Sequence, residues 1–194
     1  MQNGLRIHTC RRFSYLHQEF DSYYFLLNND TVVELDTIQL LLEYLQELIE
    51  PLNLNTVDAV FGSRMITKGG ALKGGMPFYK FIGNIILTKI QNFLLGTKLS
   101  EFHSGYRVYN VRSLKKIPFL LNSNSYNFDT EIIVQFKLVN FKIKEIAIPT
   151  FYGKEISYLN GIEYACNILI NTFTGSLHRF GFKYQKKFNL KKND

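Results

Sequence analysis

Apolar residues of this chain gather in short blocks that Gly, Pro, Asn and Asp separate. Compact apolar runs at 23–27 and 57–61 predict strands, and so does an alternating run at 142–148. Apolar residues at helical spacing predict helices over 37–49, 77–95, 127–136 and 158–177, with a break in the second near Gly83. Strands that alternate with helices indicate an α/β layer fold.

The segment 77–95 has two interpretations. Its apolar side chains, among them Phe81, Ile82, Ile86 and Phe93, fall mostly on one broad face. An apolar stripe of this kind usually packs into a core. However, the sequence from Ala59 to Ser100 contains no acidic residue and six basic ones, which suits a helix lying in a membrane interface. Both interpretations stay open at this stage.

Charge is unevenly distributed over the 194 residues, whose formal net charge is +7. Nine of the 16 acidic residues but only three of the 23 basic ones occur up to Asp58. Seven of the 13 glycines fall between Gly62 and Gly96, inside the acid-free stretch. Glycine lets backbone amides approach a ligand, and unopposed Lys and Arg attract anions. The partner is therefore expected to be an anionic lipid or a phosphorylated small molecule; no nucleic-acid motif is present.

The chain shows no apolar run of roughly 18 residues and no apolar leader after its first residues. Its two cysteines, Cys10 and Cys166, match no metal-binding spacing and indicate a reducing compartment. We therefore expect a cytoplasmic protein, peripheral on the inner face of the membrane. The tail 184–194 is basic and also suits contact with anionic lipid.

Seven short motifs follow one another in a recognisable order. They are GSR at 62–64, GMP at 75–77, GN at 83–84, LSEFHSGYR at 99–107, NFDTEI at 127–132, IAIPTFYG at 146–153 and LHRFG at 177–181. Together they resemble the second half of family 2 glycosyltransferases, and in particular the polyprenyl-phosphate sugar synthases. The resemblance covers about residues 56–183.

This resemblance implies a partial GT-A fold (the nucleotide-diphospho-sugar transferase fold) over residues 1–183, with C-terminal amphipathic helices. It also implies transfer of a sugar from a nucleotide-sugar donor to a lipid phosphate or a hydroxyl, with Mg²⁺ or Mn²⁺ as cofactor. The family holds this metal with a D-x-D motif, and Asn28-Asn29-Asp30 stands in its place here. Asp30 is thus the expected metal ligand, with Asn28 as a weaker one.

The motif around residues 99–107 supplies the remaining candidates. Arg107 is the main one, as a bidentate phosphate ligand that stabilises the departing diphosphate. Arg64, His103 and Ser104 are expected to contact phosphate beside it. Glu101 is a candidate general base if the acceptor is a hydroxyl, whereas a phosphate acceptor needs no base.

Nothing in residues 1–20 resembles the segments with which the family domain begins, which bind the nucleobase. We therefore expect the chain to lack that pocket, to expose the strand edge beside residues 23–27, and to aggregate or oligomerise with little transfer activity alone. An inactive fragment, an accessory subunit and a basic membrane-surface binding protein without catalysis are the alternatives to an enzyme.

Overall fold

The computed structural model describes residues 6–10, 13–17, 23–28, 57–152 and 161–190. Six strands form one mixed sheet in the order β1-β2-β3-β5-β4-β6. Their bounds are Arg6–Cys10 (β1), Phe13–His17 (β2), Tyr23–Asn28 (β3), Ala59–Ser63 (β4), Arg107–Asn110 (β5) and Ile143–Ala147 (β6). The expected mixed α/β architecture is confirmed.

The direction of the strands decides which of their ends meet. Strands β3 and β4 both run antiparallel to β5, and β6 runs parallel to β4. The carboxyl ends of β3, β4 and β6 and the start of β5 therefore lie at the same edge of the sheet. In open α/β sheets this edge is where ligands bind.

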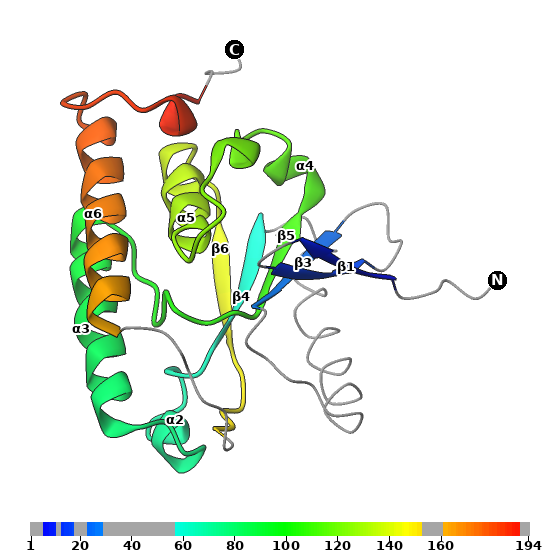
Figure 1. Cartoon of the computed structure of the whole chain (residues 1–194), viewed down its shortest axis with the longest axis vertical. Coiled ribbons are helices and arrows are strands. Elements are labelled where there is room, and N and C mark those ends of the chain that lie inside the picture. Colours follow the sequence, from blue (N-terminus) through cyan, green and yellow to red (C-terminus); the bar gives the residue numbers. More distant parts are fainter. Residues whose placement is uncertain (1–5, 11–12, 18–22, 29–56, 153–160, 191–194) are drawn as a thin grey trace.

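Helices cover the sheet (Figure 1). They are α2 (Gly70–Lys73), α3 (Phe78–Leu95), α4 (Val111–Leu114), α5 (Phe128–Leu138) and α6 (Gly161–Arg179), with 3₁₀ turns at Phe119–Leu121 (η1) and Lys186–Phe188 (η2). Within the described part of the chain, no helix is long and apolar enough to cross a membrane.

Helices α3 and α6 lie side by side and run in the same direction. Gln91 bonds to Thr172, Leu94 O accepts from Ser176 Oγ at 2.9 Å, and Leu95 O accepts from Arg179 at 2.9 Å. The residue numbers rise together on both helices, which makes the pair parallel.

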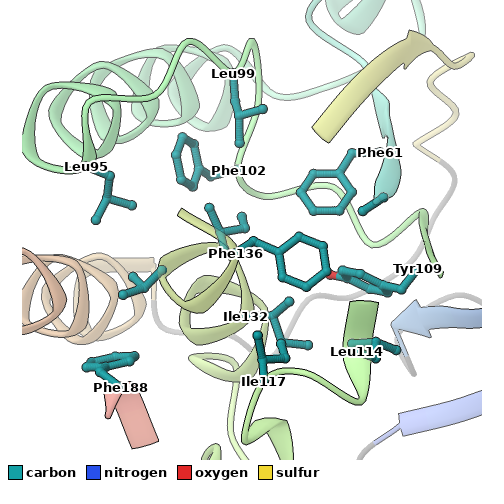
Figure 2. Close-up of a cluster of buried hydrophobic side chains, with 13 residues drawn as sticks. Phe61, Leu95, Leu99, Phe102, Tyr109, Leu114, Ile117, Ile132, Phe136 and Phe188 are labelled. Atoms are coloured by element: carbon teal, nitrogen blue, oxygen red, sulfur yellow. The ribbon is translucent and has the colours of Figure 1, made fainter. Parts of the chain in front are cut away.

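The core lies between α5 and the sheet (Figure 2). Tyr109 of β5 meets Phe61 of β4 and Phe136 of α5 edge to face, with ring centroids 5.6 and 5.5 Å apart. All three rings are almost completely buried. Such T-shaped contacts contribute roughly 0.5–1.5 kcal/mol each beyond area burial, so this cluster fixes α5 to the central strands.

Most predicted elements are confirmed, with ends displaced by a few residues. The strands predicted at 23–27, 57–61 and 142–148 are β3, β4 and β6, and three predicted helices are α3, α5 and α6. The helix predicted at 37–49 lies outside the described residues. The expected break at Gly83 is wrong, because α3 is continuous through it. The hairpin β1–β2 and the central strand β5 were not predicted.

The hairpin also corrects the expectation of an open edge beside β3. Strand β2 pairs antiparallel with β3, with Phe13 opposite Asn28 and Ser14 opposite Leu27. The backbone groups of β3 at this end therefore have a neighbouring strand.

Helix α3 is amphipathic in the reverse of the usual sense. Its buried residues are Asn84, Thr88, Gln91 and Leu95. Several of its apolar side chains point outward, with Phe93 85% and Ile86 51% exposed. The interpretation of this apolar face as ordinary core is wrong, because α3 turns its polar side to α6 and to the loop of residue 101.

Candidate phosphate-binding site

The fold brings the predicted site residues to one edge of the sheet. Asn28 ends β3, Arg64 directly follows β4, and Arg107 begins β5. The register places both Leu26 and Phe61 opposite Arg107. Asp30, the expected metal ligand, lies outside the described residues. Among the described residues, no group of three or more His, Cys, Asp or Glu side chains could hold a metal, and the metal stays a prediction.

Arg64 and Glu101 form the centre of the site. Glu101 Oε1 accepts hydrogen bonds from Arg64 Nε at 3.0 Å and from Arg64 Nη2, and Glu101 Oε2 accepts from the Arg64 backbone N–H at 2.8 Å. Asn84 Nδ2 of α3 donates to the same carboxylate at 2.7 Å. The Glu101 side chain is fully buried, whereas that of Arg64 is 19% exposed. The pair thus ties the end of β4 to α3.

The rest of the Arg64 guanidinium is also engaged. Nη1 donates to the Tyr152 hydroxyl at 3.1 Å, and Nη2 donates to the His103 carbonyl at 3.1 Å. Burial opposes the positive charge, but Glu101 and Tyr152 together raise the pKa of Arg64 above its ordinary value. Arg64 is therefore a fixed cation with one partly accessible side.

Glu101 is poorly placed for the role of general base. A base must reach the proton that it accepts, whereas this carboxylate faces four donor groups of Arg64 and Asn84 inside the protein. In this conformation Glu101 positions Arg64. Its predicted catalytic role requires the pair to open.

Asn84 and Tyr152 are site residues that residue-by-residue reasoning missed, although both lie within the quoted motifs. Tyr152 is held in place by a close approach of two loops. A Cβ at Gly74 would lie 2.0 Å from the Thr150 carbonyl oxygen, and Tyr152 N donates to Gly74 O at 2.8 Å. Only glycine allows this contact. The presence of Gly74 directly before the GMP motif was therefore the sequence signal for the close approach of the two loops.

The loop that carries Glu101 is anchored by a second carboxylate. Glu145 of β6 accepts from the Ser100 backbone N–H at 2.7 Å, from Ser100 Oγ at 2.8 Å and from the Glu101 backbone N–H at 3.2 Å. Ser100 Oγ also lies 2.6 Å from Ser63 Oγ at the end of β4. This network holds the loop against both neighbouring strands.

Arg107 is inside the protein. Its guanidinium donates to the carbonyl oxygens of Ser104 (3.0 Å), Phe102 (2.5 Å) and Asp129 (3.2 Å), and its carbon lies 4.8 Å from the centre of the Phe61 ring. The residue is 2% exposed. In this conformation Arg107 has a structural role, and the phosphate-binding role predicted from the sequence stays a prediction.

His103 and Ser104 lie between these two arginines. Burial, with Arg107 and Arg64 adding to it against the opposing effect of Glu101, lowers the pKa of His103 to about 4, so the ring is neutral at pH 7. His103 Nδ1 lies 3.0 Å from the Tyr164 hydroxyl, and Nε2 has no hydrogen-bond partner among the described residues. Ser104 is buried, and its hydroxyl accepts from the Tyr106 backbone N–H at 3.3 Å. Of the two, His103 has a ring nitrogen that is buried and without a hydrogen-bond partner among the described residues.

Comparison with known proteins identifies the class. No family model matches the chain. An uncharacterized protein of Methanocaldococcus jannaschii is 32% identical over 143 residues, which are 74% of this chain and 54% of that protein. The low-salt glycan biosynthesis hexosyltransferase of Haloferax volcanii is 31% identical over 114 residues, 58% of this chain and 26% of that protein. A dolichyl-phosphate hexose transferase of the same organism is 29% identical over 108 residues, 56% of this chain and 44% of its own length.

The mixed α/β sheet, the arginine at the end of β4 and these similarities define a glycosyltransferase-related protein. The resemblance that the motifs indicate is confirmed: the chain is a relative of the family 2 glycosyltransferases, of the polyprenyl-phosphate sugar transferase type. It spans between about a quarter and about half of the length of the curated relatives that it matches.

Proposed function

We propose that this chain acts in the transfer of a sugar from a nucleotide-sugar donor to a lipid phosphate at a membrane surface. The relatives named above include a dolichyl-phosphate hexose transferase and a hexosyltransferase of glycan biosynthesis, which supports the reaction class. The arginine fixed at the carboxyl end of β4 supports a site for phosphate groups there.

The engagement of Glu101 favours a phosphate acceptor over a hydroxyl acceptor, and this observation carries the proposal. A hydroxyl needs a base to take its proton, whereas a phosphate oxygen is already ionised at neutral pH. The Glu101 carboxylate is buried and bonded to Arg64 and Asn84. With a phosphate acceptor, one of its oxygens forms the new bond to the anomeric carbon while the bond from that carbon to the nucleoside diphosphate breaks.

Arg64 supports this step as a fixed positive charge, because its side chain stays 19% exposed while it is bonded to Glu101 and Tyr152, and a cation attracts phosphate groups. His103 Nε2 is a buried nitrogen without a hydrogen-bond partner among the described residues, and it would have to become accessible to contact a phosphate. A divalent cation at Asp30 and Asn28 would neutralise the diphosphate of the donor, as the family resemblance implies.

Contact with the membrane is the second part of the proposal, and the exposed apolar residues of α3 and α6 support it. On α3, Ile86, Ile90 and Phe93 are exposed, and on α6 Ile170 and Phe173 are 63% and 52% exposed. Exposed apolar residues that gather on one face mark interaction surfaces. The basic residues Lys80, Lys89, Lys98, Arg179 and Lys183 occur on or next to these helices, and their charge suits an anionic lipid surface.

Sugar transfer tests the reaction. The purified protein is incubated with a panel of radiolabelled nucleotide sugars, Mg²⁺ or Mn²⁺, and vesicles containing polyprenyl phosphate. The expected result is a labelled product that partitions with the lipid and depends on the polyprenyl phosphate. Arg64→Gln should abolish it, whereas the exposed Arg112→Gln should not. Absence of product with every donor, and of any nucleotide-sugar binding, would contradict the proposal.

Membrane contact has its own matched test. Phe93 of α3 and Leu120 of η1 are both 85% exposed, so each can be changed to serine without disturbing the core. Co-sedimentation with vesicles containing phosphatidylglycerol should fall for Phe93→Ser and stay unchanged for Leu120→Ser. It should also weaken with salt, because lysines contribute to it. Equal effects of the two variants would show that α3 does not face the lipid.

A further inference from the structure

Tyr164 of α6 reaches the arginine site from outside the motifs of the sequence. Its hydroxyl lies 3.0 Å from His103 Nδ1, and the two rings meet edge to face with their centroids 5.7 Å apart. Helical spacing puts Tyr164 on the same side of α6 as Ile168 and Thr172, which are both buried. The inner face of α6 therefore brings one tyrosine to a residue that lies 61 positions away in the chain.

The two arginines hold the backbone around His103 but not its ring. Arg64 Nη2 donates to the His103 carbonyl at 3.1 Å. Arg107 Nε donates to the next carbonyl, that of Ser104, at 3.0 Å. These bonds leave the side-chain torsions of the imidazole undetermined. Among the described residues, the Tyr164 hydroxyl is the one hydrogen-bond partner of the ring, so this contact sets the direction in which the ring nitrogens point.

The direction of this hydrogen bond follows from the donors and acceptors present. A neutral imidazole has one N–H and one acceptor nitrogen, whereas a tyrosine hydroxyl both donates and accepts. Burial raises the pKa of Tyr164 above its ordinary value, so the hydroxyl keeps its proton. Within the described part of the chain, His103 Nδ1 is the acceptor that this proton reaches. The hydroxyl thus donates to Nδ1, and the imidazole carries its own proton on Nε2.

The Nε2–H group is then a buried donor without a partner among the described residues. Buried donors normally have an acceptor, and the positive charge of Arg64 attracts phosphate groups to this place. We propose that Tyr164 is a positioning residue of the arginine site: its hydroxyl fixes His103 as the Nε2–H tautomer, a neutral donor to an oxygen of the phosphate that binds at Arg64. Ligand entry has to uncover Nε2. This inference rests on the proposed function, because the phosphate comes from there.

Nitrogen NMR of the histidine rings tests the tautomer without any ligand. In the full chain with isotope-labelled histidine, the signals that are absent from His103→Gln belong to His103. We expect a protonated Nε2 and a hydrogen-bonded, unprotonated Nδ1 in the wild type, and loss of the hydrogen-bond shift at Nδ1 in Tyr164→Phe. Tyr126→Phe is the matched control, because the Tyr126 ring also contacts Tyr164, at 6.1 Å between centroids. A protonated Nδ1 in the wild type, or equal changes in the two variants, would overturn the proposal.

Calorimetric titration with inorganic pyrophosphate tests the link to phosphate. Tyr164→Phe keeps the aromatic ring but releases the imidazole, so it should weaken pyrophosphate binding several-fold, whereas Tyr126→Phe should leave it unchanged. Thermal unfolding of both variants checks that the fold is retained. Equal binding by the wild type and Tyr164→Phe would refute the role of Tyr164 alone. A wild-type protein that binds no pyrophosphate would instead refute the phosphate site at Arg64, on which the proposed function and this inference both depend.

Discussion

Replacing Arg107 with lysine tests whether this residue belongs to the core or to the ligand site. Lysine keeps the positive charge but loses the planar fork. The guanidinium donates to three backbone carbonyl oxygens from three different nitrogens, and its carbon stacks on Phe61. A single ammonium group on a thinner stem cannot reproduce this arrangement, so we expect the variant to lose stability rather than only activity.

The magnitude follows from the bonds that are lost. Hydrogen bonds to charged groups contribute about 1.5–3 kcal/mol each. If the ammonium keeps one of the three carbonyls and two are lost, Arg107→Lys should reduce the free energy of unfolding by about 3–6 kcal/mol. This loss is a large share of a typical total of about 5–15 kcal/mol.

Denaturant unfolding followed by circular dichroism measures this difference. Arg112→Lys is the control, because Arg112 is exposed on α4, and it should stay within about 0.5 kcal/mol of the wild type. If Arg107→Lys were equally stable and instead lost only ligand binding, the guanidinium would face a ligand, and the structural role assigned above would be refuted.

Four further substitutions test the packing and the charges. Gly175→Ala should reduce stability by about 1–3 kcal/mol, because its Cβ would lie 2.5 Å from Val134 Cγ1. Gly83→Ala should stabilise α3 by up to about 1 kcal/mol, because a Cβ there meets nothing within 4 Å. Thermal unfolding of both variants measures the two effects. Because the folded pKa of His103 is about 4, the unfolded chain binds its proton first. The free energy of unfolding should therefore fall by about 3 kcal/mol through this group as the pH falls from about 6.5 to 4. His103→Gln should remove that part of the pH dependence of unfolding. Glu101→Gln leaves the Arg64 charge unpaired and should destabilise the fold by about 3–5 kcal/mol in denaturant; an unchanged midpoint would show that the pair is not formed in solution.

The sequence alone was a good guide to elements and family. Compact apolar runs located β3 and β4, and regular spacing of apolar residues located β6, α3, α5 and α6, because such patterns report local backbone geometry. The sequence analysis missed β5, whose first residue, Arg107, is the last residue of a motif that we interpreted only chemically. The same motifs indicated the relationship that the comparisons confirm.

Only the tertiary structure decided which surface each side chain faces. Helical spacing showed an apolar stripe on α3, but the polar side with Asn84 and Gln91 is the buried one, since Glu101 and Thr172 offer it partners. In the sequence, Arg64 and Arg107 each end a motif that contains Ser and Gly. Arg64 sits where β4 ends and stays partly accessible, whereas the loop before β5 folds its carbonyls around Arg107. Burial of this kind depends on contacts between segments far apart in the chain, and local spacing carries no record of those contacts.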